Sequence, residues 1–415
     1  ISRVSGSAVQ NADRADRSPV IRQEKRLPDG DSAYTVSENG ITVCAYRDML
    51  KFLFSGNDLS VDPFVFGRTR RPRLLFSVDG EIHDALASGC VPENHGGTLT
   101  FTDDEKDFCA KTGITVSGKH RCIAISFTAR GHFSRICPML CFEPCLAPTS
   151  KRAAHPAYCD IMITAEYLSD RSLILYSVKD HGGGEGLCIA VSFECRGGNE
   201  EYLLTRSGLG LMYGEKDVEE LVTADFPDTV YSVGEPFCAV KKESECPGGK
   251  YAANILITVG KGRGDAVGSM LAVRQEYRRR GAYGRFSAAA ARSAAERAAA
   301  CGKRYDGRYT GLMLARTLLN RNAGFCDSPH GIGELYRHGI SGDLPVFCLD
   351  VTDTLTDGSP AAVTAAGFIA AHKYLSLCGI RTDLVIFYES DGDYGGKQRE
   401  AINALCDAAA SAFLI

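Results

Sequence analysis

Three cysteines, Cys137, Cys141 and Cys145, follow one another at intervals of four residues. Thiolates grouped in this way could hold zinc or an iron–sulfur cluster, but the common thiolate sites separate paired cysteines by only two residues. If the segment forms a strand, all three side chains lie on one face of it, where a buried cysteine behaves as a small hydrophobic residue. The spacing therefore favours a structural role, and we expect neither a metal site nor a cofactor.

Two glycine-rich segments could surround a phosphate group. In residues 182–186, Gly-Gly-Gly-Glu-Gly precedes an apolar segment typical of a strand, whereas phosphate loops precede a helix. We interpret this segment as the loop of a β-hairpin. Residues 261–265, Lys-Gly-Arg-Gly-Asp, do precede a predicted helix and could hold an anion, but the other residues of a phosphate loop are missing.

A third polar group lies in the segment His-Gly-Ile-Ser-Gly-Asp-Leu-Pro, where His338, Ser341 and Asp343 come close together. Ser341 and Asp343 could bind a ligand with His338, or they could hydrogen-bond the amides of the turn. We favour the turn interpretation and keep all three residues as candidate binding residues. No Ser-His-Asp or Cys-His arrangement follows from spacing, so we predict no catalytic residue.

The segments that would position these residues are short and apolar or alternating in polarity. They occur at 41–46, 73–78, 98–101, 120–127, 160–165, 172–178, 188–193 and 254–259, with turn residues at 79–80, 94–97 and 182–184. Because no long helical pattern separates them, they predict a large antiparallel β-sandwich over residues 33–260. Residues 1–32 are polar and aperiodic, which predicts a linker or a loose arm.

The composition changes after residue 260. Residues 264–301 are rich in Ala, Arg and Glu and predict two helices separated near Gly281 and Gly284, and a third helix follows over 309–320. These helices make up a predicted helical linker over 261–333. Residues 334–415 predict a small α/β module, with strand 346–351, helix 361–377 ending at Gly379, strand 383–388 and helix 397–410. The first three elements form a parallel βαβ unit without a glycine-rich phosphate turn.

Composition restricts the partners of the chain. Its 47 basic and 51 acidic residues give no attraction to nucleic acid, and we interpret the basic run 278–280 as a solvated helix face. No apolar stretch approaches the roughly 20 residues of a membrane span, and no signal peptide is visible. The 17 scattered cysteines fit free thiols in a reducing compartment. We expect a cytoplasmic protein, either by itself or within a larger membrane-attached protein.

Several segments resemble the bacterial cyclic β-1,2-glucan synthases and the related cellobiose-phosphorylase-like family. Residues 142–148, Phe-Glu-Pro-Cys-Leu-Ala-Pro, and 153–158, Ala-Ala-His-Pro-Ala-Tyr, resemble the family's EPVLAP…AHPAFS segment. Residues 335–346 and 372–386 resemble its LWGYGISGDLPIV and AHAYWRLKGLRVDLVI segments. The segments occur in the same order from about residue 35 to the end. The tryptophans usual in the family are replaced, as at Tyr336, and residues 226–249 are interpreted as an inserted stretch.

The resemblance implies a supersandwich-type β-domain that precedes a helical barrel carrying the catalytic acid. No barrel sequence follows here, so we expect this chain alone to be inactive and to bind or position a β-glucan oligosaccharide. His338, Ser341 and Asp343 then become candidate carbohydrate-binding residues. The alternative hypothesis is a non-catalytic scaffold or homodimerisation module without sugar binding. Because residue 1 is Ile and the sequence stops within an apparent element, we also expect the chain to be part of a longer polypeptide.

Overall fold

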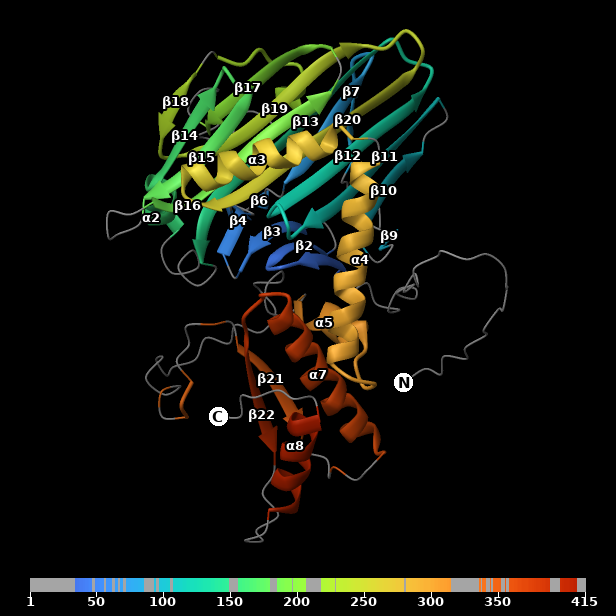
Figure 1. Ribbon diagram of the computed structural model, residues 1–415, viewed down its shortest axis with the longest axis vertical. Helices are drawn as coiled ribbons and strands as arrows, with labels where there is room; N and C mark the ends of the chain where they lie inside the picture. Colours follow the sequence, from blue (N-terminus) through green and yellow to red (C-terminus); the bar gives the residue numbers. More distant parts are fainter. Residues whose placement is uncertain are drawn as a thin grey trace.

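The protein is described by a computed structural model. The described residues are 34–46, 49–55, 57–61, 64–65, 68–69, 72–85, 93–94, 97–104, 107–148, 156–179, 185–195, 197–206, 218–227, 229–279, 281–314, 336, 338–340, 344, 346–351, 355, 358–388 and 396–408. Figure 1 shows a wide β-sandwich, a long helix that leaves it, and a smaller α/β module at the far end of that helix. The predicted fold class is therefore confirmed.

In the described part of the chain, nine strands form the first sheet of the sandwich. Its long central strand β13 (Arg135–Pro148) pairs on one side with β7 and β4 and on the other side with β19, all antiparallel. The remaining strands extend the sheet in both directions. The other members are β1 (Tyr34–Glu38), β2 (Ile41–Tyr46), β3 (Met49–Phe54), β4 (Asn57–Val61), β7 (Arg73–Val78), β8 (Glu81–Asp84), β17 (Asn199–Thr205) and β19 (Pro236–Glu245).

The second sheet also has nine antiparallel strands among the described residues. Its order places β20 at the centre and β18 and β9 at the two edges. The members are β18 (Tyr231–Val233), β14 (Ile163–Leu168), β15 (Leu173–Lys179), β16 (Glu185–Cys195), β20 (Lys250–Lys261), β12 (Cys122–Gly131), β11 (Phe108–Ser117), β10 (Leu99–Asp104) and β9 (Glu93–Asn94). Strands β15 and β16 pair antiparallel, and residues 182–184 of the glycine-rich segment predicted as their hairpin loop lie outside the described residues.

The main core lies between the two sheets because the side chains alternate along each strand. On β12, Ile123, Ile125 and Phe127 point into this core. Their neighbours Cys122 and Ala124 belong to a second cluster on the outer face. Aromatic contacts join the layers, since the ring of Phe76 on β7 lies 5.1 Å from that of Phe127. Both faces of β12 are therefore buried, one in the main core and the other in the outer cluster.

Helices cover the outer faces. Helix α3 (Arg263–Tyr277) lies across the second sheet, where its buried residues Ala266, Met270 and Val273 pack on the outer cluster (Figure 1). The 3-10 helix η3 (Val218–Val222) packs on the outer face of the first sheet. A short helix, α2 (Pro156–Ile161), precedes β14. The segment 160–165, predicted as one strand, is therefore helical over its first two residues.

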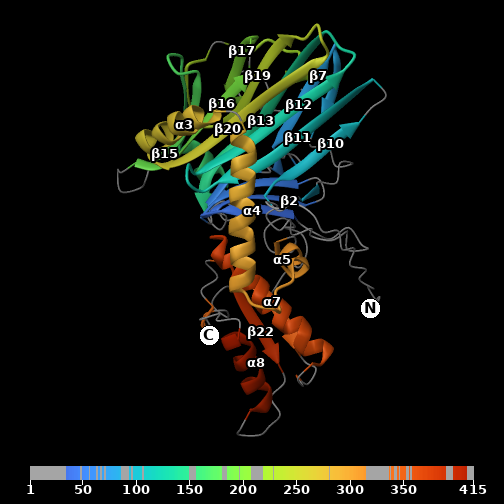
Figure 2. The same cartoon turned by 45° about the vertical axis from the view of Figure 1, so that its right-hand side comes forward.

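Helix α4 (Ala282–Ala300) connects the sandwich to the module, as Figure 2 shows. Gly281, with φ of 77°, separates it from α3, as predicted. Gly284 does not break the helix, because it lies inside the first turn of α4. The N-terminal half of α4 lies so close to the sandwich that a Cβ on Gly97 would be 1.9 Å from the carbonyl oxygen of Ser287.

The module contains the predicted parallel βαβ unit. Strands β21 (Val346–Val351) and β22 (Asp383–Tyr388) pair in parallel, and α7 (Pro360–Leu377) connects them. Ser359 caps α7 by accepting a hydrogen bond from the Ala362 amide, and Gly379 follows the helix with φ of 82°. The remaining elements are α5 (Gly307–Leu314), α8 (Lys397–Ala408) and the small hairpin of β5 (Phe64–Val65) and β6 (Arg68–Thr69).

One prediction about the sandwich was wrong. Residues 226–249, interpreted as an inserted stretch, contain β18 and β19. Strand β19 pairs with β13 on one side and with β17 on the other, so it is an interior strand of the first sheet. An interior strand cannot be removed without exposing the backbone groups of both neighbours. This stretch is therefore an integral part of the fold.

Candidate functional site

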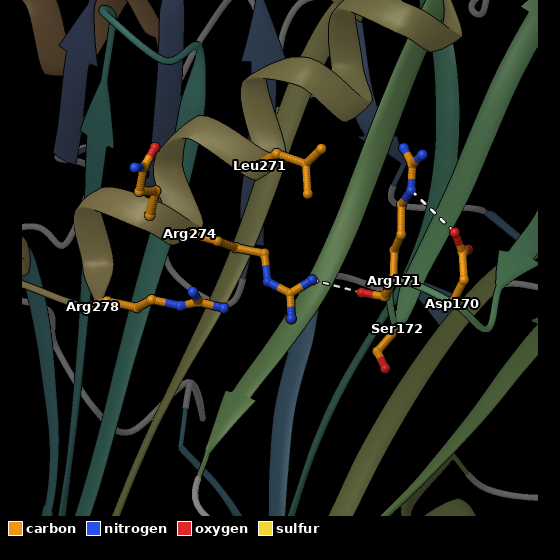
Figure 3. A pocket seen from close by; sticks show the side chains of 7 residues that line it. Asp170, Arg171, Ser172, Leu271, Arg274 and Arg278 are labelled. Carbon is orange, nitrogen blue, oxygen red and sulfur yellow. Dashed lines mark hydrogen bonds and ion pairs between the residues drawn. The ribbon is translucent and has the colours of Figure 1, made fainter.

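A hollow opens on the outer face of the second sheet, between α3 and the turn that joins β14 to β15. Figure 3 shows the side chains that line it. Its volume is about 510 Å³. We call it the arginine hollow, because three of its seven lining residues are arginines. The lining residues are Asp170, Arg171, Ser172, Leu271, Arg274, Gln275 and Arg278.

Helical spacing brings four of these residues together. Leu271, Arg274, Gln275 and Arg278 are separated by three, one and three positions, which places them on one face of α3. The opposite face of α3 is fixed by its packing against the sheet. The hollow therefore has one rigid wall.

The second wall is the β14–β15 turn. Ser172 has a φ of 50°, and the amide of Arg171 donates to the carbonyl of Leu168 at 3.1 Å. This tight conformation directs the carbonyl of Arg171 toward α3, where it accepts a hydrogen bond of 2.6 Å from Arg274 (Figure 3). The Arg171 side chain forms an ion pair of 3.3 Å with Asp170. The two walls are thus joined by a direct hydrogen bond.

Arg274 is also held from below by the second sheet. Its Nε atom lies 2.6 Å from a carboxylate oxygen of Glu194 on β16, and Ser192 donates to the same oxygen. Arg274 is about one-fifth exposed, so its guanidinium group is fixed at the floor of the hollow. The Arg278 side chain, by contrast, is exposed and has no hydrogen-bond or ion-pair partner among the described residues. One arginine is positioned by its neighbours and another remains available to a ligand.

A second group of side chains lies beside the hollow, at one end of the sandwich. We call it the tyrosine edge, and it consists of Tyr167, Glu200 and Tyr202. Tyr167 on β14 and Tyr202 on β17 belong to different sheets, and their rings stack at 3.7 Å with an angle of 18°. The Tyr167 hydroxyl donates to Glu200 at 3.3 Å. The positive charge of Arg274 in the arginine hollow acts on the carboxyl group of Glu200, so the two groups interact electrostatically.

The carboxyl group of Glu200 is electrostatically unusual. Burial raises its pKa, the Glu194 charge raises it further, and Lys242, Tyr167 and Arg274 lower it by smaller amounts. A carboxyl group in this state can accept hydrogen bonds when ionised and can donate one when protonated. With two tyrosine rings beside it, the tyrosine edge can bind a polar ligand that also offers an apolar face.

The residues selected from the sequence lie elsewhere or outside the described residues. His338 is exposed in a turn that follows Tyr336, and it does not line the arginine hollow. Ser341 and Asp343 lie outside the described residues. The proposed carbohydrate-binding role of His338, Ser341 and Asp343 thus stays a prediction.

The three regularly spaced cysteines lie on β13. Cys137 and Cys141 are buried with Met139 in a cluster on the outer face of the first sheet, and burial raises the pKa of the Cys137 thiol to about 11. Cys145 is buried in a separate small cluster with Ala147 and Cys159. Across the described residues, no group of three or more His, Cys, Asp or Glu side chains is arranged to hold a metal ion. The surroundings of these thiols are those of packed hydrophobic residues.

The anion site considered at residues 261–265 is filled by the chain itself. Asp265 in the first turn of α3 accepts a hydrogen bond of 2.9 Å from the Lys261 amide. Its carboxylate also forms an ion pair of 2.8 Å with Arg121. The negative charge that a helix N-terminus favours is therefore supplied by Asp265.

In the described part of the chain, no helix combines the length and hydropathy of a membrane span.

Sequence reasoning missed both the arginine hollow and the tyrosine edge. The run 278–280 was interpreted as a solvated face, although the first of its arginines, Arg278, lines the hollow. The helical spacing from Leu271 to Arg278 was a usable signal for one wall. No local signal connects Tyr167 with Tyr202, because they are brought together only by the packing of two sheets.

Comparisons with protein-family models and with curated proteins found no match. Among solved structures, a bacterial glucoamylase complexed with acarbose is similar with a TM-score of 0.42 and 8% identity, over 72% of this chain and 42% of that one. A putative aldose 1-epimerase from Escherichia coli K12 has a TM-score of 0.31 and 7% identity, over 55% of this chain and 99% of that one. A heparinase III has a TM-score of 0.34 and 10% identity, over 59% and 38%.

This chain thus spans less than half of the glucoamylase and of the heparinase III. With TM-scores below 0.5, these likenesses carry no argument about the chemistry of this chain.

Proposed function

We propose that this chain is the carbohydrate-binding and positioning part of a β-glucan-processing glycosyltransferase or phosphorylase, similar to the cyclic β-1,2-glucan synthases. The observation that carries the proposal is the tyrosine edge, where two stacked aromatic rings adjoin a partly buried carboxyl group. The apolar face of a glucose ring can pack against aromatic side chains, and its hydroxyls can hydrogen-bond to Glu200 and Tyr167. The order of sandwich, long helix and βαβ unit agrees with the order of the resembling segments.

The direct test is a calorimetric titration of the purified chain with linear β-1,2-glucan. The proposal predicts saturable binding at millimolar or lower ligand, with less or no binding of a β-1,3-glucan of equal length. Absence of heat at millimolar β-1,2-glucan would contradict it. An accompanying assay should find neither release of glucose 1-phosphate nor transfer of glucosyl units, because the resemblance assigns no catalytic residue to this chain. Measurable turnover would refute the expected inactivity.

The second candidate function is a scaffold or dimerisation module without sugar binding. It is favoured by exposed apolar side chains on α2, on the edge strand β18 and at Val230, which precedes β18. The exposed fractions are 72% for Tyr158, 60% for Ile161, 61% for Val230, 60% for Tyr231 and 61% for Val233. Exposed apolar side chains on an edge strand are typical of protein contacts.

Sedimentation analysis of the wild-type chain and of a Tyr231→Asp, Val233→Asp variant separates the two functions. A dimer that dissociates in the variant, together with no glucan binding, supports the scaffold. A chain that stays monomeric at every concentration and binds glucan supports the carbohydrate function.

A further inference from the structure

The arginine hollow has a positive charge that glucan binding does not require. Arg171, Arg274 and Arg278 supply three positive charges to its lining, and Asp170 is its one acidic lining residue. Glu194 lies beneath the floor, where it is already paired with Arg274. The net charge of the lining residues is thus +2, and it falls to +1 when Glu194 is included. A neutral oligosaccharide gains nothing from this excess.

The hydrogen-bonding groups in the hollow are mainly donors. Each guanidinium group presents five N–H donors and no acceptor, and Ser172 and Gln275 can donate as well. Arg274 uses Nε and Nη1 for Glu194 and the Arg171 carbonyl, so its other terminal nitrogen remains for a ligand. Among the residues that the structure describes, none occupies the planar fork of Arg278. A planar fork next to fixed donors matches the oxygens of a phosphate, sulfate or carboxylate group.

Figure 3 shows the arrangement of these groups. The side chain of Arg278 extends from the last turn of α3 along the same wall as Arg274, toward the side where Ser172 lies. Leu271 forms the opposite part of that wall and is the only apolar lining residue. An anion placed between Arg278 and Arg274 would also lie close to the β14–β15 turn. The surroundings combine a fixed cation, an exposed cation and hydroxyl and amide donors.

We propose that the arginine hollow is an oxyanion-binding site, which takes a phosphate, sulfate or carboxylate group with Arg278 and Arg274 as its main ligands. The oxyanion can be free in solution, or it can be a substituent of a saccharide. The proposal goes beyond glucan binding and does not depend on it. Because Arg278 is exposed, added salt weakens the interaction by screening.

The test measures the binding of inorganic phosphate, inorganic sulfate, glucose 6-phosphate, glucuronate and glucose to the whole chain by calorimetry at one ionic strength. The proposal predicts that at least one anionic ligand binds and that glucose binds much more weakly. Arg278→Gln should weaken anion binding about tenfold or more, because a charge-assisted hydrogen bond is lost. The matched control is Arg279→Gln, which removes the same charge from the next, exposed residue that does not line the hollow.

The outcomes are distinct. Tighter binding of glucose 6-phosphate or glucuronate than of inorganic phosphate and sulfate identifies a substituted saccharide as the source, and equal binding identifies a free oxyanion. Equal weakening by Arg278→Gln and Arg279→Gln would show only general attraction by positive charge and would overturn the site. Absence of binding by every anion would also overturn it. Titration of the wild-type chain with neutral β-1,2-glucan tests the proposed function separately, because that ligand carries no charge for the arginine hollow.

Discussion

Tyr176 connects the two sheets through a single side chain. It lies on β15 of the second sheet and is fully buried. Its hydroxyl donates to the carbonyl oxygens of Phe237 at 2.9 Å and of Leu204 at 3.3 Å, which belong to strands of the first sheet. Burial raises the pKa of Tyr176 well above its ordinary value, so the hydroxyl stays protonated and continues to donate.

Replacement of Tyr176 by Phe should therefore destabilise the sandwich without creating a large cavity, because the ring is kept. We expect the free energy of unfolding to fall by about 1–2 kcal/mol, since two buried carbonyl groups lose a donor. Urea denaturation measures this change. Tyr231→Phe is the control, because Tyr231 is 60% exposed and its hydroxyl can be replaced by water. An unchanged midpoint for Tyr176→Phe would show that the hydroxyl contributes nothing between the sheets.

The raised pKa of Glu200 makes the stability of the protein depend on pH. Because burial raises its pKa in the folded protein, the folded state binds the proton more tightly than the unfolded state does. The free energy of unfolding should therefore decrease as pH rises from the ordinary value of 4.5 through the raised value.

Glu200→Gln cannot ionise and should lose this decrease. Urea titrations of both proteins between about pH 4 and about pH 7 measure the difference. The stability of the wild type should fall relative to that of the variant as pH rises, whereas Glu220→Gln, at an exposed carboxyl group, should follow the wild type. Parallel curves for wild type and Glu200→Gln would contradict the effect of burial.

At the scale of elements, the sequence predicted most strands because apolar alternation is a direct consequence of burying one strand face. Its errors occur where local composition and tertiary context disagree. Gly284 was expected to end a helix, but the surrounding Ala-rich sequence and the packing of α4 on the sandwich maintain the helix through it. Strand β19 was missed as an interior strand because the stretch 226–249 diverges from the resembling family, and Lys241 and Lys242 interrupt its apolar pattern. Lys241 is in fact buried and donates to the Val222 carbonyl.

Strands β3 and β4 contain a buried ion pair. Lys51 Nζ lies 3.0 Å from Asp58, and the two side chains are 2% and 0% exposed. Lys51 lies on the same strand face as Leu53, which packs against the module. Asp58 Oδ1 has no hydrogen-bond partner among the described residues, so the carboxylate depends on Lys51.

Lys51→Met should destabilise the protein by about 3–5 kcal/mol, because it leaves the Asp58 charge buried without its partner. The double variant Lys51→Met, Asp58→Leu should recover most of this loss. The control Arg135→Gln removes an ion pair whose charged atoms lie 3.9 Å apart and whose side chains are both about 60% exposed. It should change the free energy of unfolding by less than about 1 kcal/mol. If the double variant were less stable than Lys51→Met, the ion pair could not be the cause.

At the scale of the whole molecule, α4 joins the sandwich and the module into one structure. Arg297 on α4 donates to the carbonyl of Ser37 on β1, and its guanidinium group lies 5.8 Å from the ring centre of Tyr374 on α7. Cys44 of the sandwich is buried in the same cluster as Cys378 of the module, and burial raises the pKa of Cys44 to about 12. The module therefore packs directly on the face of β2 and β3 that points away from the main core.

The fold could be predicted from the sequence and the functional surface could not, for one physical reason. Strand and helix patterns are local, because each residue's polarity reflects the face on which it lies. The arginine hollow combines residues about 100 positions apart, and the tyrosine edge combines residues of two sheets. Their positions depend on how the sheets pack, which no segment of the sequence encodes alone. The domain limits at residues 33, 261 and 334 stay predictions.

The most direct test of carbohydrate binding at the tyrosine edge compares the affinity of two variants for linear β-1,2-glucan. Tyr202→Leu keeps an apolar side chain but removes the ring that stacks on Tyr167. The control Tyr231→Leu removes an exposed tyrosine from β18. We predict that Tyr202→Leu weakens glucan binding about tenfold, since a stacked ring contributes on the order of 1 kcal/mol or more. Equal affinity of Tyr202→Leu and Tyr231→Leu, both unchanged from the wild type, would contradict carbohydrate binding at the tyrosine edge.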